Sequence, residues 1–168
     1  QDALVANTTG DNNTAVGRLT LDANTTGAQN TALGTLALGA STTGDRNVAV
    51  GYATLDANTT ASDNTAIGTA ALGVNTTGDR NVAIGNYSLD ANTVGDRNVA
   101  VGYGALTTYN PSTNEDSYNT AIGYAALYEN TTGNFNTAVG GLSMDANTTG
   151  SGNVAVGEDS LSGNTTGD

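Results

Sequence analysis

The stretch NTTGDRNVAIGNYSLDANTVGDRNVAVG, residues 75–102, states one short phrase twice. Its GDRNVAIG at 78–85 returns as GDRNVAVG at 95–102, with every residue number raised by 17. Repetition at a fixed period indicates a repeat architecture, whatever the length of the chain. We number the residues of one repeat as places 1 to 17, beginning at the pentapeptide Asn-[Thr/Val]-Ala-aliphatic-Gly.

This pentapeptide occurs nine times, at a period of 17 except for one interval of 21. Asn, Ala and Gly never vary at places 1, 3 and 5, and place 9 is Leu in every copy except that of Met144. We therefore expect residues 1–168 to form a single repeat domain, with an insertion loop within 107–118. The copies begin at Asn13, Asn30, Asn47, Asn64, Asn81, Asn98, Asn119, Asn136 and Asn153.

Places 2 to 4 form a short β pattern, because Thr or Val and an aliphatic residue flank the alanine. Places 2 and 4 would face one side of the strand and the alanine the other. The glycine at place 5 and the NTTGD cluster are turn residues, and the leucine at place 9 predicts a second short extended segment. The sequence thus predicts an all-β parallel β-solenoid, or β-roll, of about ten coils. Disorder is the alternative for such a polar chain, but the strict register of the aliphatic residues argues against it.

Equivalent places of neighbouring coils would lie one strand spacing apart, about 4.8 Å. The nine place-1 asparagines should then form an internal ladder with amide-to-amide hydrogen bonds. Place 10 supports this stacking, because Asp22, Gly39, Asp56, Gly73 and Asp90 alternate acid with glycine and so separate like charges. The Asp-Arg pairs at places 16 and 17, such as 45–46 and 79–80, predict a surface charge ladder of small energetic value.

Each coil offers only about two large aliphatic side chains, which is little for a coil of this length, so a second buried face is expected. The invariant alanine of place 3 would point away from the inner aliphatic residues. We interpret it as a close contact between chains, with a homotrimer favoured; the alternative is that alanine fits a tight space within its own coil. This column comprises Ala15, Ala32, Ala49, Ala66, Ala83, Ala100, Ala121, Ala138 and Ala155.

The motifs NVAIG, NTAVG and NVAVG resemble the SVAIG-type motif of the YadA-like heads of trimeric autotransporter adhesins. The longer phrase NTAVGxxxLxANTTG resembles repeats in phage tail-fibre proteins and bacterial surface proteins. The resemblance extends over essentially the whole chain, although the coils here are longer than those of adhesin heads. It implies a left-handed β-roll, trimer formation, and a location outside the cell, at the cell surface or on a virion fibre.

The amino-acid composition limits the functions that we expect of this chain. A net charge of −12 disfavours nucleic acid and anionic membrane surfaces as partners, and no apolar run suggests membrane insertion. Without His, Cys or Lys the chain has no usual catalytic base or nucleophile, so we expect no enzymatic activity and no cofactor. Calcium in the turns and glycans on threonines or at Asn-x-Thr sequons are weaker hypotheses. The sequons begin at Asn7, Asn12, Asn24, Asn58, Asn75, Asn130, Asn147 and Asn164.

One region departs from the repeat. The insertion segment TTYNPSTNEDSY, residues 107–118, holds the only proline, and six of the eight aromatic residues lie between positions 103 and 135. Tyrosines beside a loop on a rigid scaffold suit contact with a glycan or a protein of a host or matrix. The alternative is that these rings pack the loop against the coil. The candidate patch comprises Tyr103, Tyr109, Tyr118, Tyr124 and Tyr128.

Together these patterns favour a structural, rod-like segment of an extracellular fibre that serves display or adhesion. The first alternative is the receptor-binding shaft of a phage tail fibre. A self-assembling filament is a second, because residues 1–11 and 158–168 align and so begin and end the chain at equivalent phases. Ice binding is a third, although regular Thr-x-Thr pairs, its usual signature, are replaced here by adjacent threonines.

Overall fold

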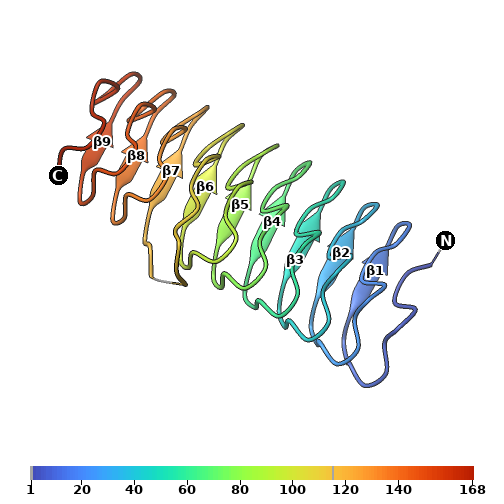
Figure 1. The fold of residues 1–168 in the computed structure, drawn as a ribbon. Coiled ribbons are helices and arrows are strands. Elements are labelled where there is room, and N and C mark those ends of the chain that lie inside the picture. Colours follow the sequence, from blue (N-terminus) through green and yellow to red (C-terminus); the bar gives the residue numbers. More distant parts are fainter. Residues whose placement is uncertain (1, 115) are drawn as a thin grey trace.

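The chain winds into a solenoid whose short strands stack in chain order as one parallel sheet (Figure 1). Each strand pairs with its equivalent in the next coil, so that Thr65 lies opposite Val82 and Ala66 opposite Ala83. The strands are β1 (Thr14–Val16), β2 (Thr31–Leu33), β3 (Val48–Val50), β4 (Thr65–Ile67), β5 (Val82–Ile84), β6 (Val99–Val101), β7 (Thr120–Ile122), β8 (Thr137–Val139) and β9 (Val154–Val156). The predicted all-β solenoid, with one repeat of the sequence in each coil, is therefore confirmed.

This computed structural model describes residues 2–114 and 116–168. Nine strands define nine coils joined by eight coil-to-coil steps, close to the ten coils expected. Among these described residues there is no helix, and so none of the length and apolarity needed to cross a membrane.

The interior of the coil is lined by the alanine of place 3 and the leucine of place 9. Ala66, Ala83, Leu72 and Leu89 are all fully buried within a single chain and belong to one hydrophobic cluster. The prediction that the alanine column faces another chain is therefore wrong. The coil is thin, and a small side chain on the strand leaves room for the leucine that the same coil sends inward from place 9.

The outer face of the sheet carries the side chains of places 2 and 4. Thr or Val fills place 2 and Val, Leu or Ile fills place 4 in all nine strands, so this outer sheet face carries no charged residue. At place 4, Val16 is 57% exposed and Ile84 is 37% exposed. The β-branched residues that we expected inside thus form a flat, uncharged exterior.

The segment around place 9 is a series of turns and not a second strand. Leucines there, such as Leu55 (φ 51°) and Leu89 (φ 53°), adopt the left-handed conformation, as do the residues at places 7 and 17. Residues other than glycine rarely adopt this backbone conformation. Bonds between coils continue through these turns: Leu38 N–H donates to Thr54 O at 3.0 Å and Thr42 N–H to Thr59 O at 2.9 Å. The neighbouring coil therefore imposes a backbone that the sequence alone does not suggest.

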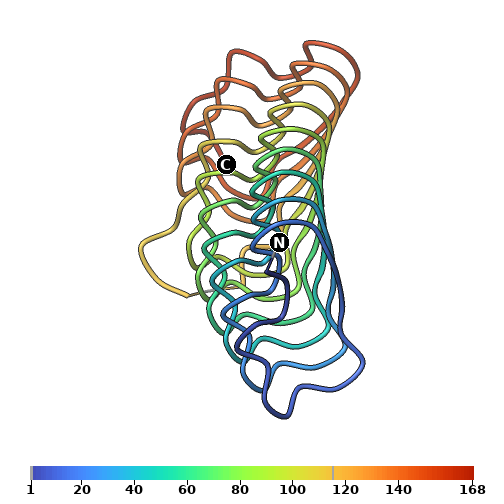
Figure 2. The same cartoon turned by 90° about the vertical axis from the view of Figure 1, so that its right-hand side faces the viewer.

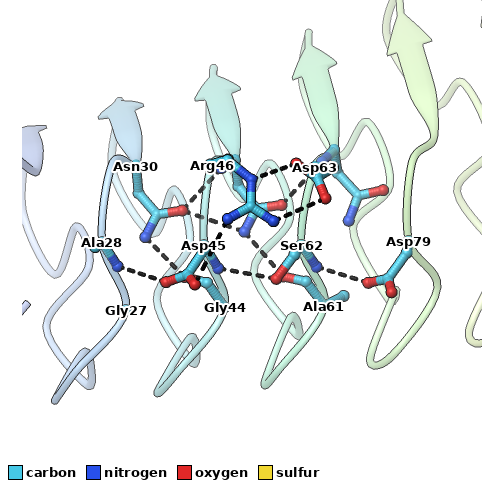
Figure 3. Close-up of polar contacts among 12 residues, drawn as sticks. Gly27, Ala28, Asn30, Gly44, Asp45, Arg46, Ala61, Ser62, Asp63 and Asp79 are labelled. Atoms are coloured by element: carbon cyan, nitrogen blue, oxygen red, sulfur yellow. Dashed lines mark hydrogen bonds and ion pairs between the residues drawn. The ribbon is translucent and has the colours of Figure 1, made fainter.

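The nine place-1 asparagines stack in one column and bond each coil to the next. Figure 3 shows the part of this column around Asn30. Asn30 Oδ1 accepts the backbone N–H of Asn47 at 2.9 Å, while Asn30 Nδ2 donates to Gly44 O at 2.8 Å. The backbone N–H is thus the principal donor in this column, and amide-to-amide bonds occur only at some steps, such as Asn47 to Asn30 at 3.2 Å.

Place 16 carries a second set of bonds between coils. Asp45 Oδ1 accepts the backbone N–H of Ala28 at 2.8 Å, and Ser62 Oγ accepts that of Asp45 at 3.0 Å (Figure 3). Beside this column, Arg46 Nε and Nη2 donate to the carboxylate of Asp63 at 2.6 and 3.0 Å. Arg46 Nη1 also lies 3.8 Å from Asp45 Oδ2, so the charge ladder that we expected is present at this step. Asp45 takes part both in this ladder and in the hydrogen bond from the backbone of Ala28.

The alternation at place 10 has a steric cause as well as an electrostatic one. A Cβ added to Gly39 would lie 2.6 Å from Asp56 Oδ1, and one added to Gly73 would lie 3.0 Å from Asp90 Oδ1. Each aspartate therefore occupies the space beside a glycine of the preceding coil.

The insertion coil, residues 98–118, keeps the sheet intact. Strands β6 and β7 pair in register although the insertion lengthens the interval between them. The extra residues leave the coil as a loop that projects from the side of the solenoid in Figure 2 (the yellow segment before β7). At place 12 of this coil, Tyr109 replaces the usual asparagine and is fully buried.

Candidate functional site

A tyrosine-lined groove lies beside the carboxyl ends of β6 and β7. Tyr103 and Tyr124 occupy place 6 of neighbouring coils, directly after the glycine that follows each strand. Their rings stack with centroids 5.8 Å apart and an angle of 14° between planes. Tyr87 packs edge-on against Tyr103 at 5.9 Å, which fixes the first ring from the other side. Stacked and edge-on geometries are the favoured arrangements of aromatic pairs.

The groove has a volume of about 440 Å³. Tyr128, from place 10, joins the two stacked tyrosines in lining it, and all three rings are substantially exposed. The remaining lining residues are small or aliphatic, with two carboxylates: Ala125, Leu142, Ala146, Glu129 and Asp145.

The local sequence explains why the groove opens here. Place 6 lies outside the core and accepts any side chain, so consecutive tyrosines can stack there without disturbing the coil. The next place 6 is Gly141, and a Cβ added to it would meet nothing within 4 Å. The tyrosine stack therefore ends abruptly, which leaves room above Leu142 and Asp145.

The two carboxylates of the groove differ in environment. Glu129 is exposed, whereas Asp145 Oδ1 is shielded from solvent and has no hydrogen-bond partner among residues 2–114 and 116–168. Buried polar atoms are normally hydrogen-bonded, so this oxygen is an acceptor to which the described part of the chain supplies no donor. The lining residues include no cationic side chain.

Tyr109 and Tyr118 do not line the groove, so the five candidate tyrosines do not form one patch. Tyr109 is buried, and its hydroxyl donates to Asn134 Oδ1 at 2.6 Å, which supports the packing role that we gave as the alternative. Tyr118 stacks on Phe135 at place 17, with centroids 5.9 Å apart. The sequence signal for the groove was the recurrence of tyrosine at place 6, and the acidic residues Glu129 and Asp145 were not among the residues that we selected.

The Tyr118 cluster already contains a cation. The guanidinium of Arg97 lies over the Tyr118 ring, 5.6 Å from its centroid, and forms an ion pair with Asp116. Asn114 Nδ2 donates to Thr77 O at 3.4 Å, so the loop also contacts a coil further back along the solenoid. These contacts hold the described part of the insertion loop against the coils.

The asparagines at place 12 bear on the glycan hypothesis. Asn24, Asn58, Asn75, Asn130 and Asn147 each begin a sequon and are fully buried. The amide of Asn75, for example, donates to Gly78 O at 2.9 Å. A glycan on such a nitrogen would need space that the folded coil does not provide, so these sequons encode a structural column. No group of three acidic side chains suited to a metal ion occurs in the described part of the chain.

Comparison of this chain with protein-family models, with curated proteins and with solved structures gives no match.

Proposed function

We propose that this chain is a non-enzymatic structural rod, a segment of an extracellular or virion fibre that displays a binding surface. The observation that carries this proposal is the continuity of the solenoid: one nine-stranded sheet runs its whole length, and side-chain ladders link successive coils. Solenoids of this kind are extended, with each coil supported only by its neighbours.

Self-association is the second part of the proposal. The outer sheet face is uncharged over nine strands, with Val, Leu or Ile at every place 4 and Thr or Val at every place 2, and such a face favours burial over contact with water. Eight steps of about 4.8 Å make this face about 38 Å long. We propose that copies of the chain pack side by side through it, with a trimer as the favoured state. The interface then consists of Thr, Val, Leu and Ile side chains, and not of the buried alanines.

Small-angle scattering and sedimentation of the purified chain test both parts. We expect an elongated particle with the mass of a small oligomer. Ile67→Glu with Ile84→Glu should give monomers, because both side chains lie at the centre of the outer sheet face. The control is Thr43→Glu with Thr60→Glu, which adds the same charge on an exposed turn. A compact monomer in every case would contradict the proposal.

The place of the protein on a cell or a virion distinguishes an adhesin or surface filament from a tail fibre. Antibody labelling of intact cells and of virions from the source should mark one of them at the outer surface. Labelling that requires broken cells would contradict an extracellular role.

Ice binding receives less support from the geometry than the structural role. The first threonine of each NTT turns its hydroxyl to the backbone of the next coil, as Thr42 Oγ1 does toward Thr59 O at 3.1 Å. The second threonine, such as Thr43, is exposed but forms a single column and not a two-dimensional array. We expect no thermal hysteresis, and a measured hysteresis would revive this function.

A further inference from the structure

The side chains that line the tyrosine groove are of the kinds that bind a cationic group. Its polar groups are three phenols and two carboxylates, so it offers negative charge and π faces but no charged donor. The faces of aromatic rings attract cations, and the attraction grows when a carboxylate lies nearby and water is displaced. The unpartnered Oδ1 of Asp145 adds negative charge at the lining that no donor of the described chain offsets.

Elsewhere in the same molecule, a tyrosine ring and a carboxylate do bind a cationic side chain. At the insertion loop, the guanidinium of Arg97 lies over the Tyr118 ring and pairs with the Asp116 carboxylate. The groove presents tyrosine faces and carboxylates in the same combination, at Tyr103, Tyr124, Glu129 and Asp145. The difference is that no arginine reaches it: the chain has only four Lys and Arg residues in total, and none lines the groove.

We propose that the groove binds the guanidinium group of an arginine on a basic segment of a partner protein. The guanidinium plane stacks on the Tyr103–Tyr124 pair while its N–H groups donate to Glu129. The charge of the whole chain, −12, attracts a basic partner from a distance. The proposal deepens the proposed function, because it names the chemistry of the partner that the rod displays this groove to.

The test is a titration of the full chain with N-acetyl-arginine amide, followed by NMR chemical shifts of the tyrosine rings. N-acetyl-citrulline amide is the matched probe, since it has nearly the same shape without the charge. Methyl mannoside tests the competing glycan ligand. We expect saturable shifts with the arginine probe at low ionic strength, affinity at least tenfold weaker for citrulline, and no saturation with the mannoside.

Variants locate the binding. Tyr124→Ala should weaken binding of the arginine probe at least tenfold, and Glu129→Gln should weaken it several-fold. Tyr52→Ala is the control, because Tyr52 occupies the same place 6 four coils away and is similarly exposed, at 57% against 60% for Tyr124. Glu129→Gln preserves size, so the test stands even if Tyr124→Ala disturbs the fold.

Three outcomes would overturn the inference: equal binding of citrulline and arginine, saturable binding of the mannoside alone, or an equal loss of binding in Tyr52→Ala and Tyr124→Ala. The last would mean general attraction of a cation to an acidic chain. None of these outcomes bears on particle shape or oligomeric state, so a failure here is distinct from a failure of the structural proposal.

Discussion

At the scale of single residues, buried asparagine side chains occupy interior positions that large apolar side chains fill in most cores. A place-1 asparagine in mid-solenoid, such as Asn64, is fully buried and satisfies two backbone groups of neighbouring turns. Its Oδ1 accepts the N–H of Asn81 at 2.8 Å, and its Nδ2 donates to Gly78 O at 2.9 Å. The invariance of asparagine at this place follows from this double role, which no other side chain of that size performs.

Replacing Asn64 with alanine should therefore be costly. It leaves the backbone N–H of Asn81 without its acceptor, at about 1–3 kcal/mol. It also removes one of the two donors to Gly78 O, which keeps the hydrogen bond from Asn75. With the loss of one further hydrogen bond, we expect the free energy of unfolding to fall by about 2–4 kcal/mol in urea titrations monitored by circular dichroism. Thr43→Ala, on an exposed turn, is the control and should change it by less than about 0.5 kcal/mol. Similar losses in both variants would show that the asparagine column is not a major source of stability.

The place-10 aspartates predict how stability depends on pH. Burial raises the pKa of Asp56, with a further contribution from Asp22, and burial likewise raises the pKa of Asp90 above its ordinary 3.8. A carboxyl whose pKa is higher in the folded than in the unfolded chain favours folding below its unfolded pKa, and this contribution is lost as pH rises through the folded pKa. The melting temperature should therefore rise as the pH is lowered from neutral toward the ordinary pKa of 3.8.

Melting curves of the native chain and of Asp56→Asn with Asp90→Asn test this dependence. The double variant should be more stable than the native chain near neutral pH and should change less with pH. Asp63 acts in the opposite sense, because its hydrogen bond from Arg46 lowers its pKa, and its contribution is lost only in stronger acid. A native chain whose stability falls steadily from neutral pH downward would contradict the prediction.

At the scale of elements, the strand and the turns at place 5 and the NTTGD cluster were predictable, and the turns around place 9 were not. Alternation at places 2 to 4 identifies the strand, and the period of 17 gives its parallel register. Alternation does not say which face is inside, however, and a branched aliphatic residue such as Ile84 was assigned to the core in place of Ala83. The turns around place 9 were predicted as an extended segment, because leucines such as Leu89 adopt a left-handed backbone that an isolated chain disfavours.

The candidate site was predictable only in part, for a related reason. Tyrosines that share place 6, such as Tyr103 and Tyr124, come together because the repeat itself brings equivalent places into contact. Asp145 and Glu129 belong to columns that look structural elsewhere along the chain. They line a groove only because Gly141 has no side chain to fill the space beside them. That effect of Gly141 can be recognised only once the coils are stacked.

The insertion loop should be dispensable for the fold. Its coil is where the place-1 column changes: Asn98 Nδ2 donates to Asp96 O, whereas Asn81 Nδ2 of the preceding coil donates to Gly95 O at place 15. Replacing residues 108–118 with the sequence of 91–97 restores a coil of the usual length and the place-12 asparagine. We expect a melting temperature equal to or above that of the native chain, with the same circular dichroism spectrum.

The contrasting variant keeps the loop and removes its buried ring. Tyr109→Ala leaves a cavity in the coil, and truncating a large buried aromatic side chain costs about 3–5 kcal/mol. If the loop replacement were as destabilising as Tyr109→Ala, the loop would be part of the fold and not an addition to it.

At the scale of the whole molecule, stability is a sum over coils and the interfaces between them, which makes length adjustable in units of one coil. Between residues 22 and 90, place 10 makes this unit two coils, because aspartate and glycine alternate there with twice the period of the repeat. Deleting residues 47–80 removes two coils and leaves Gly39 beside Asp90, so that the asparagine column, the leucine column and the alternation at place 10 continue. The exposed ion pair between Arg46 and Asp63 is lost, at a small cost. Scattering should show a rod shorter by about 10 Å, two strand spacings, with an unchanged cross-section.

Deleting residues 47–72 removes a shorter segment but should do more harm. It leaves a fragment of one coil that cannot close, which interrupts the sheet, the asparagine column and the leucine column at one point. We expect two melting transitions in place of one, since the two halves of the solenoid are then uncoupled. If the shorter deletion were the better tolerated one, neither the coil of one repeat nor its stacking on equivalent places would be the unit of this fold.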